Sequence, residues 1–193
     1  MKKHLFLTGP ADCGKSELLR DALGGALANA GGFVTARERQ DGRIVRCSLL
    51  PAAAAAGVEG FAPLPFLDLS LSPPLHDNEV FRGDGARLLQ EAAWYPFAVL
   101  DAFGSFELLI PQYRQALTEL LNAEQPVVGV LLGRKESAEL CRLLGLGERV
   151  GMNIEQLWKA LKADPDTMIV EAAGLSRRRA ERALAEWVRE YAV

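Results

Sequence analysis

The stretch that decides the fold is Gly9-Pro10-Ala11-Asp12-Cys13-Gly14-Lys15-Ser16, which directly follows the apolar run His4-Leu5-Phe6-Leu7. This octapeptide fits the pattern G-x-x-x-x-G-K-[ST] at each fixed position. Behind it, apolar residues recur at helical spacing from Leu18 to Leu27, and we expect Gly31-Gly32 to end that helix. The motif therefore lies between a strand and a helix, which is the context that a phosphate-binding loop (P-loop) requires.

A loop of this kind binds phosphate through its backbone. Glycines allow N–H groups to curl around phosphate oxygens, and the N-terminus of the following helix adds a favourable dipole. Lys15 would reach the β- and γ-phosphates, and the Ser16 hydroxyl would bind Mg²⁺. The alternative is a glycine-rich turn with a solvated lysine. The segment expected to contact nucleotide comprises Gly9, Pro10, Ala11, Asp12, Cys13, Gly14, Lys15, Ser16 and Glu17. Within it, Asp12 is expected to form the turn and Cys13 to fill a small space.

The rest of the chain alternates short apolar runs with helical periodicity, which predicts an α/β domain with a mostly parallel sheet and helices on both faces. Expected strands cover residues 4–7, 33–36, 44–50, 96–101, 127–132 and 167–170, and Asp41-Gly42 predicts a hairpin between the second and third. A proline-rich stretch at about 51–78 is expected to be an irregular excursion within a single domain of residues 1–193.

An acid that could complete a nucleotide site follows the apolar run 97–100. P-loop enzymes use an acid at the end of another strand to hold the metal, and Asp101 is the candidate. The alternative is that Asp101 only caps the next turn. The expected metal ligands are therefore Ser16 and Asp101, and the expected cofactor is Mg²⁺.

Three segments resemble the THEP1-type nucleoside triphosphatases, a family of small P-loop proteins with a RecA-like core. They are residues 4–16, then Gly32-Phe33-Val34-Thr35 with the hairpin Asp41-Gly42-Arg43, and residues 99–108, which are similar to the family's D-E-x-G-x-x-E-L. The resemblance covers roughly residues 3–145 and implies a RecA-like P-loop fold and hydrolysis of nucleoside triphosphates.

The chain departs from the family at the expected catalytic acid. The family carries an acid after the strand-end aspartate, and this chain has Ala102 there; Ala36 and Arg37 replace the acids after Gly-Phe-x-Thr. Losing one positioned base typically costs about 10²–10⁴-fold in rate. Glu107 is retained and is a candidate to position water, with Lys15 and Asp101 as the other catalytic candidates. A role as a helix-start acid explains Glu107 equally well.

Arginines gather at two places. Arg177-Arg178-Arg179 open the last expected helix, where they either face a bound nucleotide or are simply solvated. Arg37 and Arg39 share one face of the hairpin, where they either contact an acidic substrate or partner, or protect a solvated sheet edge.

Composition narrows the function classes. The 193 residues carry a formal net charge of −3, which argues against a general electrostatic grip on nucleic acid or membrane. The three widely spaced cysteines form no disulfide framework, and no leader or membrane span is evident, so a cytoplasmic location is expected.

The sequence thus predicts binding of a nucleoside triphosphate with Mg²⁺ and its slow hydrolysis. ATP is favoured over GTP because Gly133-Arg134-Lys135-Glu136 is not an N-K-x-D guanine clamp. The alternatives are a P-loop kinase acting on a small acceptor and a nucleotide-dependent switch with a protein partner.

Overall fold

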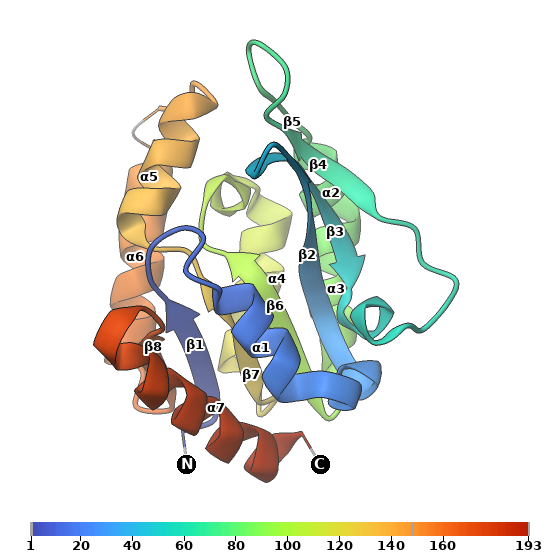
Figure 1. Ribbon diagram of the computed structural model, residues 1–193, viewed down its shortest axis with the longest axis vertical. Helices are drawn as coiled ribbons and strands as arrows, with labels where there is room; N and C mark the ends of the chain where they lie inside the picture. The colour runs from blue at the N-terminus through green and yellow to red at the C-terminus, as the bar shows by residue number, and fades with distance from the viewer. Residues whose placement is uncertain (1, 148, 193) are drawn as a thin grey trace.

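The chain folds around one mixed sheet of eight strands in the order β5-β4-β3-β2-β6-β7-β1-β8 (Figure 1). The computed structural model describes residues 2–147 and 149–192. Neighbours among β1, β2, β6, β7 and β8 pair in parallel, whereas β3, β4 and β5 extend the sheet by antiparallel pairing. The strands are β1 (His4–Thr8), β2 (Ala30–Gln40), β3 (Arg43–Pro51), β4 (Leu64–Asp68), β5 (Leu75–His76), β6 (Phe97–Phe103), β7 (Val127–Leu131) and β8 (Thr167–Glu171). The expected mostly parallel α/β sheet is confirmed.

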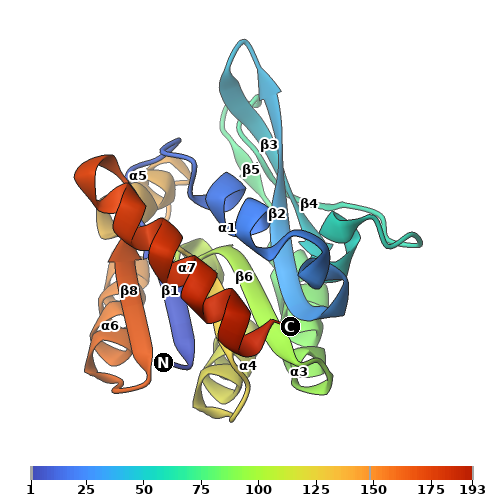
Figure 2. The same ribbon diagram turned by 60° about the horizontal axis from the view of Figure 1, so that its bottom comes forward.

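Helices cover both faces of the sheet. They are α1 (Lys15–Leu23), α2 (Asn78–Val80), α3 (Ala86–Glu91), α4 (Pro111–Asn122), α5 (Arg134–Leu143), α6 (Arg149–Ala163) and α7 (Arg177–Tyr191). Helices α1 and α7 lie across one face, and α3, α4 and α6 lie against the other (Figures 1 and 2). None of the described helices is long and apolar enough to span a bilayer.

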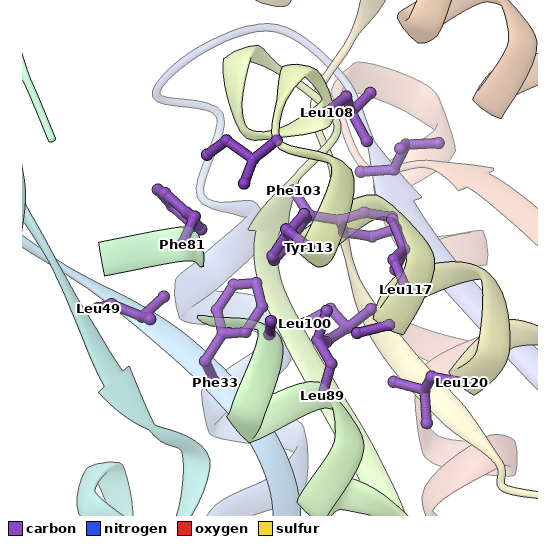
Figure 3. Close-up of a cluster of buried hydrophobic side chains, with 14 of the residues drawn as sticks. Phe33, Leu49, Phe81, Leu89, Leu100, Phe103, Leu108, Tyr113, Leu117 and Leu120 are labelled. Atoms are coloured by element: carbon purple, nitrogen blue, oxygen red, sulfur yellow. The ribbon is translucent and has the colours of Figure 1, made fainter. Parts of the chain in front are cut away.

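The two hydrophobic clusters follow from the alternation of side chains along the strands. In β1, Leu5 and Leu7 point towards α1 and α7, whereas Phe6 points to the opposite face. The larger cluster, under α3, α4 and α6, contains Phe33 of β2 and Tyr113 of α4 (Figure 3). Burial on both faces explains why the central strands are nearly continuous apolar runs in the sequence.

Two details differ from the expectation. Helix α1 ends at Leu23, where Gly24 has a φ of 49°, and a tight helical turn over Gly24–Asn29 leads to β2. Gly31-Gly32 lies within β2 and does not end the helix. The stretch at about 51–78 is less irregular than expected because it contributes β4 and β5 to the sheet. The predicted hairpin forms, with Asp41 and Gly42 at positive φ, and it projects beyond the body of the sheet (Figure 2).

The strand order brings the functional segments to one edge. Strand β7 lies between β6 and β1, and all three are parallel. Their carboxyl ends therefore place three segments side by side: the loop after β1, the end of β6 and the turn after β7. This edge is where ligands bind in open α/β sheets.

Candidate nucleotide-binding site

The loop between β1 and α1 has the conformation that its glycines allow. Gly9 has a φ of 146° and Gly14 a φ of 82°, and Gly14 is the N-cap of α1. The Lys15 ammonium donates to the carbonyl oxygens of Gly9 at 2.9 Å and Pro10 at 2.6 Å. The lysine is buried and lies over its own loop. Asp12 has a φ of 55°, in agreement with the expected turn.

Ser16 and Asp101 meet at this edge of the sheet. Ser16 Oγ donates to Asp101 Oδ1 at 2.5 Å, and the Asp101 side chain is completely buried. Burial raises the pKa of Asp101, and this shift is opposed by the positive charge of Arg37 and by the hydrogen bond from Ser16. The second carboxylate oxygen, Oδ2, is buried and has no hydrogen-bond partner among the described residues.

This pair fits a divalent cation. A hydroxyl and a carboxylate are the hard oxygen ligands that Mg²⁺ prefers. An unpartnered buried carboxylate oxygen is costly unless something else satisfies it. Ser16 and Asp101 are therefore the residues that would hold the metal, as the sequence predicts.

Thr35 of β2 fixes the end of β6. Its Oγ1 donates to the carbonyl oxygen of Asp101 at 2.6 Å and accepts a hydrogen bond from the Ala102 N–H at 3.3 Å. The threonine of the Gly-Phe-x-Thr segment thereby sets the position of the backbone that carries Asp101. Its role is to position another residue.

Arg37 extends from the hairpin into the site. Its Nη1 donates to Ser16 Oγ at 2.9 Å, and its Nη2 lies 3.9 Å from Asp101 Oδ1. Arg37 therefore contacts residues of this chain's own site, and its contact with a substrate or partner stays a prediction. Arg39 pairs with Asp12 at the exposed rim, so the hairpin also contacts the P-loop.

Glu107 holds the turn after β6. Its Oε1 accepts hydrogen bonds from the N–H groups of Gly104 at 2.5 Å and Ser105 at 2.9 Å. Burial raises the pKa of this carboxyl, and the backbone N–H groups oppose that shift. A hollow of about 170 Å³ lies at the P-loop, and Glu107 is not one of the described residues that line it. The geometry therefore gives Glu107 a structural contact and does not bring it next to Lys15 or Ser16.

Glu136 is an acid of the site that the sequence reasoning did not single out. It lies in the first turn of α5, and its Oε2 is 3.5 Å from the Lys15 ammonium. The sequence feature that points to Glu136 is its position just after the apolar run 127–132, where a strand is expected to end. Glu136 lies near the P-loop because the strand before it, β7, pairs with β1. The sequence does not show this strand order.

The three C-terminal arginines differ in whether they contact the P-loop. Arg177 Nη1 donates to the carbonyl oxygen of Cys13 at 3.1 Å, and its Nε pairs with Glu181. Arg178 and Arg179 are exposed. The first of the three therefore contacts the P-loop.

The fold and these contacts define a P-loop nucleoside triphosphatase fold: a loop of the required sequence follows the parallel strand β1, and its serine meets an acid at the end of β6, which is separated from β1 by β7. No protein-family profile matches the chain. Over 130 residues, 66% of this chain, it is 27% identical to the nucleoside-triphosphatase THEP1 of Thermotoga sp. (strain RQ2), of which it covers 72%.

Two solved structures have the same fold. A human cancer-related nucleoside triphosphatase superposes with a TM-score of 0.63 at 19% identity, over 97% of each chain. THEP1 from the hyperthermophile Aquifex aeolicus superposes with a TM-score of 0.52 at 18% identity, over 82% of this chain and 99% of its own. The resemblance to the THEP1-type P-loop nucleoside triphosphatases is thus confirmed.

Proposed function

We propose that this protein binds a nucleoside triphosphate together with Mg²⁺ and hydrolyses it slowly to the diphosphate and phosphate. The observation that carries the proposal is the convergence of Lys15, Ser16 and Asp101 at the end of the sheet. The relatives named nucleoside triphosphatases support the class of reaction.

Each residue has a separate task in this proposal. Lys15 exchanges the carbonyl oxygens of Gly9 and Pro10 for phosphate oxygens, which carry more negative charge. Ser16 and Asp101 would hold Mg²⁺. When bound, the ion would neutralise the negative charge that develops on the phosphate oxygens. Arg37 already lies against both ligands and adds a positive charge at this position.

The proposed slow rate and the nucleotide preference rest on residues that are missing from their expected places. Ala102 stands where an acid would orient the attacking water, and its methyl group cannot accept a proton. Residues 133–136 lack a guanine clamp, so ATP is the proposed nucleotide.

The test combines binding with turnover. Calorimetry and thermal melts should show binding of ATP–Mg²⁺, with a stabilisation of about 2.7 kcal/mol at a concentration of 100 times Kd. Lys15→Ala should remove both signals, and Lys159→Ala, a change of an exposed lysine on α6, should not. Phosphate release with ATP and GTP then measures the activity and preference. Absence of binding to the wild type would refute the proposal.

One observation favours a P-loop kinase as a second candidate. A largely apolar pocket of about 190 Å³ adjoins the P-loop hollow and shares Arg37, Ile44, Leu132 and Glu136 with it. Its walls include Phe66, Phe81 and Phe106, which pack edge-on or tilted against one another. Apolar walls with a few polar groups are typical of small-molecule sites. Faster ATP consumption in the presence of a small acceptor alcohol would favour the kinase over the hydrolase.

A further inference from the structure

We propose that Glu136 is the catalytic residue that accepts a proton from the attacking water, a role that Ala102 cannot fill. The inference rests on the proposed function. In the step, the water oxygen forms a bond to the γ-phosphorus while its proton passes to the Glu136 carboxylate. The bond between the γ-phosphorus and the bridging oxygen breaks, and its electron pair leaves with the nucleoside diphosphate.

The first turn of α5 is held against the site. Strand β7 ends between β6 and β1, so the turn that follows it faces both the end of β6 and the P-loop. Ser137, the next residue, is completely buried, and its Oγ donates to the carbonyl oxygen of Gly104 at 2.8 Å. This hydrogen bond ties the start of α5 to the turn after Asp101. Glu136 therefore extends from a fixed backbone.

The contact with Lys15 places the carboxylate near the reacting group. Glu136 Oε2 lies 3.5 Å from Lys15 Nζ, and the P-loop lysine is the group that reaches the β- and γ-phosphates. Once Lys15 binds phosphate, the carboxylate is one ammonium group away from the γ-phosphate. In this proposal the attacking water lies between the Glu136 carboxylate and the γ-phosphate. Glu136 lines the P-loop hollow, the adjoining apolar pocket, and a further hollow bordered by Gly9, Pro10 and Ala11.

The other acids that line the P-loop hollow are Asp12 and Glu17, and no contact of either with Lys15 occurs in the described chain. Asp12 pairs with Arg39 at the rim. Glu17 lies exposed in the first turn of α1. The Glu107 carboxylate is held by two backbone N–H groups. Of the acids that line the P-loop hollow in the described chain, Glu136 is the one that contacts Lys15.

A purely structural role makes a different prediction. An acid in the first turn of a helix is stabilised by the helix dipole. If that were its whole contribution, replacing Glu136 by glutamine would lower the melting temperature slightly and leave the turnover number unchanged. The measurement must therefore separate stability, nucleotide affinity and turnover.

The test uses the full-length protein with ATP–Mg²⁺. Glu136→Gln should lower kcat for phosphate release by about a hundredfold or more, within the range for loss of a positioned base. Its Kd for ATP–Mg²⁺, measured by calorimetry, should stay the same or decrease because a negative charge near the phosphates is removed. Glu136→Asp should retain part of the activity. Glu119→Gln, a change of an exposed acid on α4, should behave like the wild type.

Each outcome separates the hypotheses. A Glu136→Gln protein that binds ATP–Mg²⁺ and releases phosphate within threefold of the wild-type rate overturns the role of Glu136 and leaves the proposed function intact. A variant that loses affinity but keeps kcat also overturns it, because Glu136 would then act in binding. A wild type that releases no phosphate overturns both proposals.

Discussion

Ser16 Oγ donates a 2.5 Å hydrogen bond to Asp101 Oδ1, although the two residues are 85 positions apart in the chain. The bond joins the P-loop, which follows β1, to the end of β6. Strand β7 lies between β1 and β6 in the sheet. Arg37 donates to the same serine oxygen from a third segment, the hairpin. The hydroxyl and the carboxylate are therefore already in place as a pair.

Replacing Asp101 by asparagine should separate metal binding from folding. Asp101→Asn is expected to weaken ATP binding in the presence of Mg²⁺ by at least about tenfold, or about 1.4 kcal/mol. The free energy of unfolding of the free protein should stay the same or rise, because a buried amide avoids the cost of desolvating a carboxylate. Calorimetry with Mg²⁺ and with EDTA, together with denaturant unfolding, measures both. An undiminished Mg²⁺ dependence of binding would contradict the role of Asp101.

Arg177 should contribute to nucleotide affinity and its neighbour Arg178 should not. Both arginines are exposed, but Arg177 donates to the Cys13 carbonyl and so positions a charge at the P-loop. Arg177→Ala should weaken ATP–Mg²⁺ binding several-fold, and Arg178→Ala serves as the matched control. Equal affinities of the two variants in calorimetry would show that Arg177 is a surface residue without a part in binding.

Stability should fall when the pH drops below the ordinary pKa of histidine. His4 is buried in β1, and burial, with Lys3 as the next cause, lowers its pKa from the ordinary 6.5; Asp164 and Asp166 oppose the shift. Because the folded protein then binds this proton less readily than the unfolded chain, stability is lost as the pH falls from 6.5 towards the lowered value. The slope contributed by one such group is at most about 1.4 kcal/mol per pH unit.

The variant His4→Gln isolates this contribution. Glutamine does not titrate, and its amide can donate to the Leu121 carbonyl oxygen, which lies 3.2 Å from His4 Nε2. Denaturant unfolding between pH 7 and pH 5 should show a flatter pH dependence for the variant than for the wild type. Parallel curves would mean that another group sets the slope.

The P-loop and Asp101 could be predicted from the sequence, because each is recognised from a few consecutive residues. Glu136 and Arg37 could not be placed in the same way. The position of Glu136 depends on β7 lying beside β1, and that of Arg37 on how the hairpin folds over the P-loop. The glycine pair at 31–32 shows the same limit, because the sequence pattern predicts that this pair ends a helix. In the fold Gly32 has a φ of 80°, and a β-carbon there would collide with the Val99 carbonyl. Only the packed sheet shows that requirement.

The last prediction concerns the residue after Asp101. Ala102 is half-buried in β6 and lines the apolar pocket that Glu136 also lines. Its N–H donates to Thr35 Oγ1, so the backbone at this position is fixed. Ala102→Glu should therefore place a carboxylate in the pocket that adjoins the P-loop hollow. Turnover of ATP should rise by at least about tenfold, a decrease in barrier of about 1.4 kcal/mol, with little change in Kd.

The matched control is Ala102→Gln, which adds the same bulk without the charge. Both variants should lower the melting temperature, because each introduces a polar group into a pocket with apolar walls. Only the glutamate should raise kcat, and in a Glu136→Gln background it should restore part of the lost turnover. Normal ATP binding by Ala102→Glu without any gain in phosphate release would show that the missing acid does not limit the rate. If the wild type also binds ATP–Mg²⁺ without releasing phosphate, a nucleotide-dependent switch would explain the site better than a slow hydrolase.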